Sequence, residues 1–296
     1  MTAIQLNFDT KPGIASAMLK AVLMPRKGFT QDQGLPDIQG SWINAQAEPR
    51  ALQNYLDVLG LNQTDYLPIL YPHVLAGGLH MNMLTNKSFP FGLLGAVHLK
   101  NRITQYNRIK NTQIMDIHSE MGDFRLLPKG LEFDFSTRVM VEGKKVWEEV
   151  STYFMAGKFG GKENPSSQAS FELSSLDNAE EVTKWLVPKN RGKKYAKISG
   201  DYNPIHISAT LAKLFGLKRD IAHGFGIVAE GIQASGVLEG IDYTNQAIQL
   251  DVVFKGPVFL ESQAMLKQNK QQDPARFDIY CSDNPKPSIC CSVSSV

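Results

Sequence analysis

Apolar residues recur at the spacing of a helix in several parts of the chain. Between residues 47 and 59, Leu52, Tyr55, Leu56 and Leu59 would share one helical face. The most apolar of these segments, residues 222–239, predicts a largely buried helix. The same periodicity predicts helices at residues 14–24, 47–59, 73–86, 178–186, 208–216 and 222–239.

Strands are predicted where polar and apolar residues alternate and β-branched residues are frequent. The pair Glu142-Gly143 is typical of a hairpin turn between two such segments. Residues 27–41 predict a loop, and residues 156–170, rich in Gly, Ser, Asn and charge, predict a linker. The predicted strands are residues 95–109, 112–121, 131–141, 145–155, 245–256, 258–270, 275–282 and 287–295.

The two halves of this pattern resemble each other. Residues 55–60 (YLDVLG) have the same spacing of tyrosine, aliphatic residue and glycine as residues 195–200 (YAKISG). Further along, His73 and His223 each open an apolar helix that strands follow. We infer an internal repeat, with one helix and several antiparallel strands in each copy.

The copies differ where polar chemistry is concentrated. Aligning Gly60 with Gly200 places Leu61 against Asp201 and Tyr66 against His206. The segment from glycine to histidine is also ten residues shorter in the first copy, which therefore lacks an inserted turn and short helix. The first copy is interpreted as a degenerate partner of the second.

Length and composition limit the range of functions. A chain of 296 residues suggests two domains, which we place at residues 1–160 and 171–296. The net charge of +2 gives no reason to expect binding to nucleic acid or to a membrane. The three cysteines and the polar N-terminus fit neither a disulfide framework nor an export signal, so we expect a cytoplasmic protein.

The richest polar segment lies between Gly200 and His206. Asp201 and His206 are separated by Pro204, so we expect a loop to bring their side chains together. Such a pair could hold one water molecule, with one side chain taking a proton while the other gives one. The alternative is structural: Asp often caps a helix, and a single His is often only a hydrogen-bonding group.

Gly224 follows His223 at the predicted start of the apolar helix. The unpaired N–H groups of a helix start can stabilise an oxyanion that forms in a reaction. A glycine chosen for close packing is an equal alternative at this position.

The segment Tyr195, Ile198, Ser199-Gly200-Asp201, Asn203-Pro204-Ile205-His206 and Ala212 resembles the signature of MaoC-like (R)-specific enoyl-thioester hydratases, also called hydratase 2. Residues His223-Gly224 and 254–258 (FKGPV) resemble the helix start and the following strand of that family. The resemblance covers about residues 180–296. It implies an α+β fold, a double hot-dog in which each half wraps a curved antiparallel sheet around a central helix.

The same resemblance implies the site residues. Asp201 and His206 would form the catalytic dyad, and the Gly224 N–H would polarise the thioester carbonyl. Substrate contacts are expected from Asn203, His223 and Phe225. No metal or other cofactor is expected. Several members carry a serine in the central helix where this chain has Ala229 and Ile232, so no role is carried over for it.

The expected reaction is reversible hydration of trans-2-enoyl thioesters to (R)-3-hydroxyacyl thioesters in fatty acid metabolism. The thioester partner would be acyl-CoA or acyl-carrier protein, and the basic residues between Lys189 and Lys197 could attract its phosphates, although a solvated connection explains them as well. The missing insert predicts a preference for medium, long or bulky chains. The alternatives are a hot-dog thioesterase and a non-catalytic thioester-binding module, in a monomeric double hot-dog or a homodimer.

Overall fold

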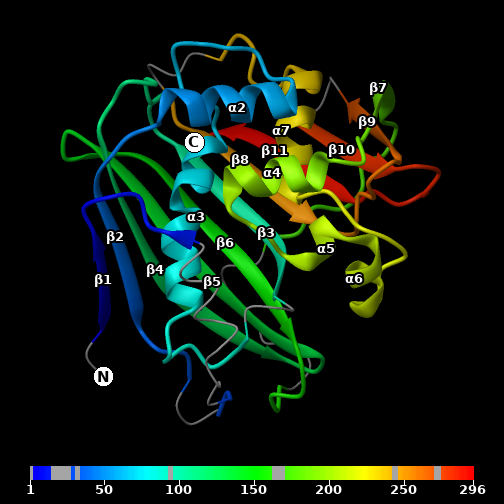
Figure 1. Cartoon of the computed structure of the whole chain (residues 1–296). Coiled ribbons are helices and arrows are strands. Elements are labelled where there is room, and N and C mark those ends of the chain that lie inside the picture. The colour runs from blue at the N-terminus through cyan, green and yellow to red at the C-terminus, as the bar shows by residue number, and fades with distance from the viewer. Residues whose placement is uncertain are drawn as a thin grey trace. The chain divides into compact units, whose positions relative to one another are not determined.

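A computed structural model describes residues 3–14, 28–30, 34–92, 96–161, 171–241, 246–269 and 275–296. It contains two compact units, neither of which is continuous in sequence (Figure 1). Unit 1 comprises residues 1–46, 71–101 and 112–171, and unit 2 comprises residues 47–70, 102–111 and 172–296. The division into domains at residues 1–160 and 171–296 stays a prediction.

Among its described residues, unit 1 packs helix α3 (Tyr71–Leu84) against a mainly antiparallel sheet. The strand order is β1-β2-β4-β5-β6-β3; β1 runs parallel to β2, and the pairings β2–β4, β4–β5 and β5–β6 are antiparallel. Apolar side chains of α3 and the sheet, including Met83, Phe133 and Phe135, form the core. The strands are β1 (Ile4–Phe8), β2 (Ile38–Ala45), β3 (Ala96–Gln105, whose last residues belong to unit 2), β4 (Met115–Leu127), β5 (Gly130–Val141) and β6 (Lys144–Ala156).

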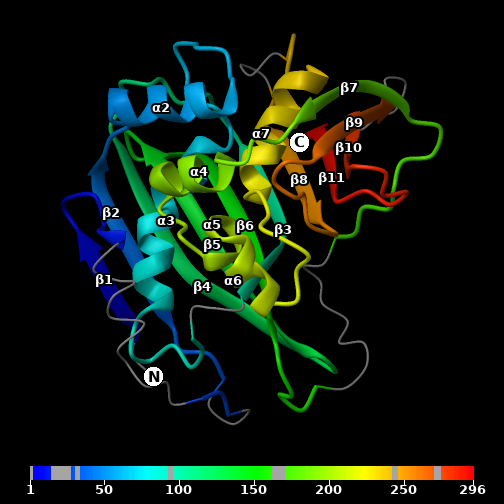
Figure 2. The same cartoon turned by 45° about the vertical axis from the view of Figure 1, so that its right-hand side comes forward.

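Unit 2 places α7 (Gly224–Ser235) against the antiparallel strands β8-β11-β10-β9-β7. Figure 2 shows α7 beside these strands, with α4, α5 and α6 following one another along the chain. The remaining elements are α2 (Pro49–Leu59), β7 (Glu180–Leu186), α4 (Arg191–Ser199), α5 (Pro204–Ile207), α6 (Ala209–Leu214), β8 (Ile248–Phe254), β9 (Gln263–Asn269), β10 (Ala275–Cys281) and β11 (Ile289–Ser295).

Local sequence signals account for several turns. Glu142 and Gly143 have φ angles of 50° and 73°, as the predicted hairpin between β5 and β6 requires. Gly60 and Gly200 end α2 and α4 with φ angles of 65° and 77°. Each glycine donates its N–H to the carbonyl four residues earlier. The matching ends of α2 and α4 support the internal repeat inferred from the sequence.

Two predictions about secondary structure were wrong. Residues 178–186 form strand β7 instead of a helix, because the segment pairs with β9, which is distant in sequence. The basic run after Lys189, for which no element was predicted, forms helix α4. The loop at residues 27–41 gives way to strand β2 at Ile38, which pairs with β4. The predicted helix at residues 14–24 lies largely outside the described residues.

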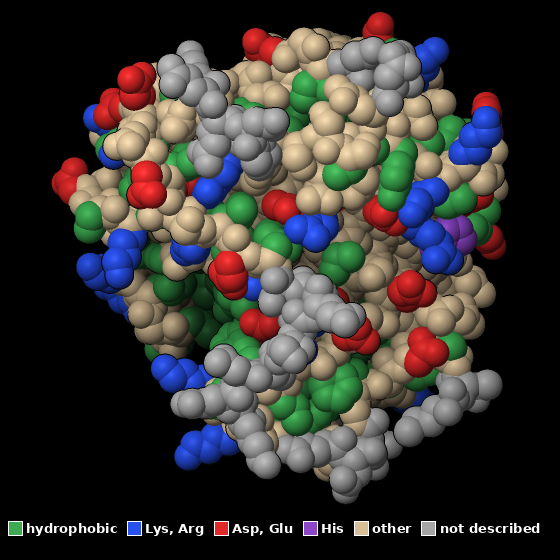
Figure 3. All heavy atoms as spheres, turned by 180° about the vertical axis from the view of Figure 1, so that it is seen from behind, with side chains coloured by type: hydrophobic (Ala, Val, Ile, Leu, Met, Phe, Trp, Pro, Cys, Tyr) green, Lys and Arg blue, Asp and Glu red, His purple; other side chains and the backbone are tan. Residues whose placement is uncertain are grey.

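Surface charge and hydropathy agree with the composition. On the face shown in Figure 3, Lys and Arg side chains are interspersed with Asp and Glu. None of the described helices combines the length and hydropathy that a bilayer-spanning helix needs. The three cysteines, Cys281, Cys290 and Cys291, are free and buried.

Candidate active site

Asp201 follows the C-terminus of α4. Gly200 turns the chain there, and the Ser199 hydroxyl accepts a hydrogen bond from the Asp201 N–H at 3.2 Å. Helix α4 is itself anchored at its start, where the buried Arg191 guanidinium binds Glu230 of α7 at 2.5 Å and the carbonyl of Val58. The position of Asp201 therefore depends on contacts of α4 with both α7 and the segment at the end of α2.

His206 lies on a four-residue helix, α5, and the expectation of an irregular loop was wrong at this point. The Asn203 side chain caps this helix by accepting a hydrogen bond from the Ile205 N–H at 3.3 Å. Pro204 is its first residue, where a proline fits because that position needs no N–H. A proline that argued against a long helix thus starts a short one.

The His206 imidazole is held in one orientation. Its Nδ1–H donates to the carbonyl oxygen of Ile221 at 2.9 Å, which leaves Nε2 on the side of Asp201. That Nε2 lies 3.8 Å from Oδ2 of Asp201. This distance is too long for a direct hydrogen bond. Asp201 also accepts the Asn203 N–H at 3.1 Å, and its side chain is 47% exposed. The pair therefore presents a ring nitrogen and a carboxylate to the same accessible point.

His223 packs against His206 and binds the backbone of Asp201. Its ring stacks on the His206 ring with centroids 3.8 Å apart and lies tilted against the Tyr195 ring at 4.8 Å. Its Nε2–H donates to the backbone carbonyl of Asp201 at 2.9 Å. Burial, and then the neighbouring His206, lower the pKa of His223 to about 3, so this ring is neutral at physiological pH. His223 therefore contacts both Asp201 and His206.

Gly224 is the first residue of α7, where the backbone N–H groups have no partner within the helix. Close packing also requires glycine here, because a Cβ atom would lie 2.4 Å from Cε1 of Phe254. Both interpretations of Gly224 from the sequence are therefore compatible with the structure. Phe225 is buried, with its ring centroid 6.0 Å from that of Phe254.

The structure thus brings Asp201, His206 and His223 together beside Gly224. Nitrogen and oxygen atoms of the first three lie within 4.8 Å of one another, close enough to share a divalent cation. Asn203 contacts Asp201 through its backbone N–H. The roles assigned to these residues from the sequence stay predictions.

A mainly apolar groove lies near this site within unit 2. Its volume is about 310 Å³, and it is bordered by residues 61–70 and by the C-terminal half of α7 and the residues that follow. Residues 61–70 are the short segment that replaces the insert of the second copy. Apolar contacts come from Leu61, Leu67, Ile69, Ala229, Ile232 and Leu238, and polar ones from Arg108, Gln233 and Glu239.

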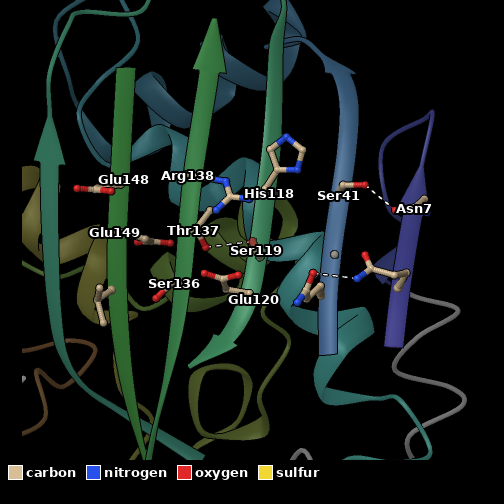
Figure 4. Close-up of a pocket in the computed structure, with 14 residues that line it drawn as sticks. Asn7, Ser41, His118, Ser119, Glu120, Ser136, Thr137, Arg138, Glu148 and Glu149 are labelled. Carbon is tan, nitrogen blue, oxygen red and sulfur yellow. Dashed lines mark hydrogen bonds between the residues drawn. The ribbon is translucent and has the colours of Figure 1, made fainter. Parts of the chain in front are cut away.

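A second hollow, of about 360 Å³, lies in unit 1 over β1, β2, β4, β5 and β6 (Figure 4). The hollow is lined by His118 and Glu120 of β4, Arg138 of β5 and Glu148 of β6. At its edge, Ser41 donates a hydrogen bond to Asn7 at 2.8 Å. Such a polar lining offers little surface to an acyl chain, unlike the groove in unit 2.

Sequence reasoning missed a second histidine–carboxylate cluster, which lies in unit 1. Nδ1 of His73 lies 2.9 Å from both carboxylate oxygens of Glu149, which also accepts a hydrogen bond from Asn101 at 2.9 Å. His80, two helical turns after His73, binds the Thr137 hydroxyl at 2.8 Å. The spacing of the two histidines was visible in the sequence, but the approach of Glu149 from β6 was not.

Comparisons with known proteins agree with the fold and the signature. Residues 176–283 match the family described as MaoC like domain. The chain is 31% identical to 3-hydroxyacyl-thioester dehydratase X of Mycobacterium tuberculosis over 260 residues, which are 87% of this chain and 89% of the relative.

Solved structures extend the likeness. The crystal structure of HtdX of Mycobacterium tuberculosis matches with a TM-score of 0.74 and 24% identity, over 87% of this chain and 100% of that chain. Another protein of that organism, described as a double hotdog fold, matches with a TM-score of 0.57 and 11% identity, over 94% of this chain and 97% of that chain. The predicted α+β double hot-dog is thereby confirmed. With the same signature, fold and near full-length similarity, the chain belongs to the MaoC-like family.

Proposed function

We propose that the chain catalyses the reversible syn hydration of trans-2-enoyl thioesters to (R)-3-hydroxyacyl thioesters. The observation that carries this proposal is the distance of 3.8 Å between Asp201 Oδ2 and His206 Nε2, while the Ile221 carbonyl holds Nδ1 of His206. The name of the mycobacterial relative, a 3-hydroxyacyl-thioester dehydratase, supports the reaction class in the reverse direction.

The protein has three roles in this reaction. It activates a water molecule, returns a proton to Cα and stabilises the enolate oxygen. A water molecule held between the Asp201 carboxylate and His206 Nε2 adds its oxygen to Cβ and loses one proton to the dyad. The dyad returns one proton to Cα on the same face, so it is unchanged after each cycle. The N–H at the start of α7 stabilises the enolate oxygen that forms meanwhile, and Gly224 allows close approach there. His223 keeps Asp201 and His206 in place.

The groove in unit 2 supports the expected preference for longer acyl chains. Its volume of about 310 Å³ is in the range of small-molecule sites. Ala229, where it borders α7, is five residues after Gly224, which corresponds to about 7.5 Å along a helix. A thioester carbonyl bound at Gly224 would therefore need a chain of several carbons to reach the groove. We expect a higher kcat/KM for eight-carbon than for four-carbon substrates.

We expect the thioester carrier to be either CoA or acyl-carrier protein. We expect the reaction to need no redox cofactor, because no electrons are exchanged when water adds to a double bond. A cytoplasmic location and a monomeric or homodimeric state also remain expectations.

The test is the absorbance of the enoyl-thioester band with four-, eight- and twelve-carbon enoyl-CoA, followed by chiral analysis of the product. Wild-type protein should remove the band and form the (R)-alcohol, whereas folded Asp201→Asn should not. An (S)-product, or full activity of Asp201→Asn, would contradict the proposal. Release of free thiol from a saturated acyl-CoA would indicate a thioesterase instead.

A further inference from the structure

Positive charge is concentrated around the candidate active site. Residues 187–220 contain eight Lys or Arg and two Asp, a net charge of +6, so the other 262 residues carry −4 of the total +2. This segment includes α4, α5 and α6, which supply Asp201 and His206 or flank them. The excess of positive charge therefore lies in the segment that contains Asp201 and His206, whereas the rest of the chain is slightly acidic.

Part of this charge is neutralised and part is exposed. Arg191 pairs with Glu230, and Arg219 pairs with Asp220 and Glu261. By contrast, the exposed lysines of α4 and of the α6 region form no ion pair with any residue that the structure describes. These are Lys193, Lys194, Lys197, Lys213 and Lys218. They are free to face an anionic partner.

Helix α6 adds an apolar surface. Only Ala212 of this helix is buried, whereas Leu211 is 41%, Leu214 79% and Phe215 43% exposed. Positions i, i+3 and i+4 lie on the same side of a helix, so these three side chains form one patch. Single exposed apolar residues are common, but a cluster next to a functional site marks an interaction surface.

Helices α4 and α6, which carry the lysines and the apolar patch, flank the segment that holds His206. A Cβ atom at Gly192 of α4 would lie 1.9 Å from the carbonyl oxygen of His206, so α4 and α5 are in close backbone contact. Helix α6 is capped by the Ser208 hydroxyl, two residues after His206. A partner that touched both α4 and α6 would therefore sit beside the site.

We propose that α4 and α6 form a docking surface for an acidic carrier-protein domain that delivers the acyl group on a phosphopantetheine arm. This inference rests on the proposed function. Lysines spread over two helices match an extended acidic surface, and the Leu211, Leu214 and Phe215 patch matches the apolar centre of a protein interface. The phosphates of a single CoA need cations but gain nothing from exposed leucine and phenylalanine side chains.

The experiment compares the same enoyl chain on CoA and on a purified acyl-carrier protein. Lys193→Glu/Lys194→Glu and, separately, Leu214→Ser should each lower kcat/KM for the carrier-protein substrate at least tenfold, mainly through KM. The same variants should lower kcat/KM for the CoA substrate less than threefold. Lys144→Glu/Lys286→Glu, which changes the net charge equally at exposed sites elsewhere, is the control and should behave as wild type.

Equal losses on both substrates, or no loss on either, would overturn the docking surface. Binding of wild-type protein to phosphatidylserine vesicles that Leu214→Ser abolishes, with unchanged carrier-protein kinetics, would assign the patch to a membrane instead. Titration of the carrier protein into Asp201→Asn by calorimetry measures docking without turnover. Docking that depends on Lys193 and Lys194, in a protein inactive on every thioester, would contradict the proposed function and retain the surface.

Discussion

Each unit contains a histidine–carboxylate pair, but the two pairs differ in exposure. In unit 1, both oxygens of Glu149 lie 2.9 Å from His73, and the Glu149 side chain is 0% exposed. In unit 2, Asp201 lies 3.8 Å from His206 and is half-exposed. The carboxylate of the first pair is enclosed, whereas that of the second is partly exposed to solvent.

The residue that follows the histidine at the start of the long helix also differs between the two units. Val74 follows His73 in unit 1, while Gly224 follows His223 in unit 2. Only the glycine allows Phe254, and by inference a substrate, to approach the backbone closely. The comparison teaches that residue types alone do not make a reactive site. The exposure of the carboxylate differs as well.

The largest expected effect separates the two carboxylates by activity. Asp201→Asn should lower kcat/KM for an enoyl thioester by about 10²–10⁴-fold, the usual size of a general acid–base contribution. Glu149→Gln, the same type of change in unit 1, should leave kcat/KM within about threefold, because its pair is not at the proposed site. Both rates should be measured on protein whose circular dichroism matches wild type. A comparable loss in folded Glu149→Gln would place unit 1 in the reaction.

Loss of the buried carboxylate of unit 1 should lower stability more than loss of an exposed one. Glu149→Ala removes a buried acceptor and leaves the side-chain donors of His73 and Asn101 without this partner, so it should lower the free energy of unfolding by about 1–3 kcal/mol. The control is Glu148→Ala on the same strand, which removes a surface pair with Lys145 and should cost about 0–1 kcal/mol. Urea titration at pH 7 measures both. Equal midpoints for the two variants would show that burial does not distinguish these carboxylates.

Acid should weaken unit 1 through its neutral histidines. Burial, and then His73, lower the pKa of His98 to about 3, and burial lowers that of His80 to about 4. Between these values and about 6.5 the unfolded chain binds more protons, so the free energy of unfolding falls as pH falls. At pH 5, His98 should cost about 2 kcal/mol of stability relative to pH 7. His98→Gln should reduce the loss between these pH values in urea titrations, and an unchanged loss would contradict it.

The smallest effect concerns the helix start. Gly224→Ala places a methyl group against Phe254 and should lower kcat/KM about tenfold or more by displacing the N–H that faces the carbonyl. Phe254→Leu in the same protein should restore part of the loss by making space. Val74→Ala in α3 is the matched change in unit 1 and should leave kcat/KM unaltered. Failure of Phe254→Leu to restore any rate would argue against a packing cause.

Local signals allowed much of the fold and half of the site to be predicted. Glycines that end α2 and α4, the Glu142-Gly143 turn and the apolar period of α7 act over a few residues, so the sequence shows them directly. The resemblance then implied roles for Asp201, His206 and Gly224, which stay predictions. Strand β7 was mistaken for a helix because its conformation depends on pairing with β9, about 80 residues away.

The sequence by itself indicated the central helix and most strands of each half, the repeat, and which copy retains the Asp–His signature. Only the tertiary structure decided how those residues are used. It set the 3.8 Å gap between Asp201 and His206, stacked His223 beneath them, and closed Glu149 onto His73 across 76 residues. The reason is physical: backbone angles follow from neighbours in the chain, whereas burial and side-chain distances follow from packing between distant segments.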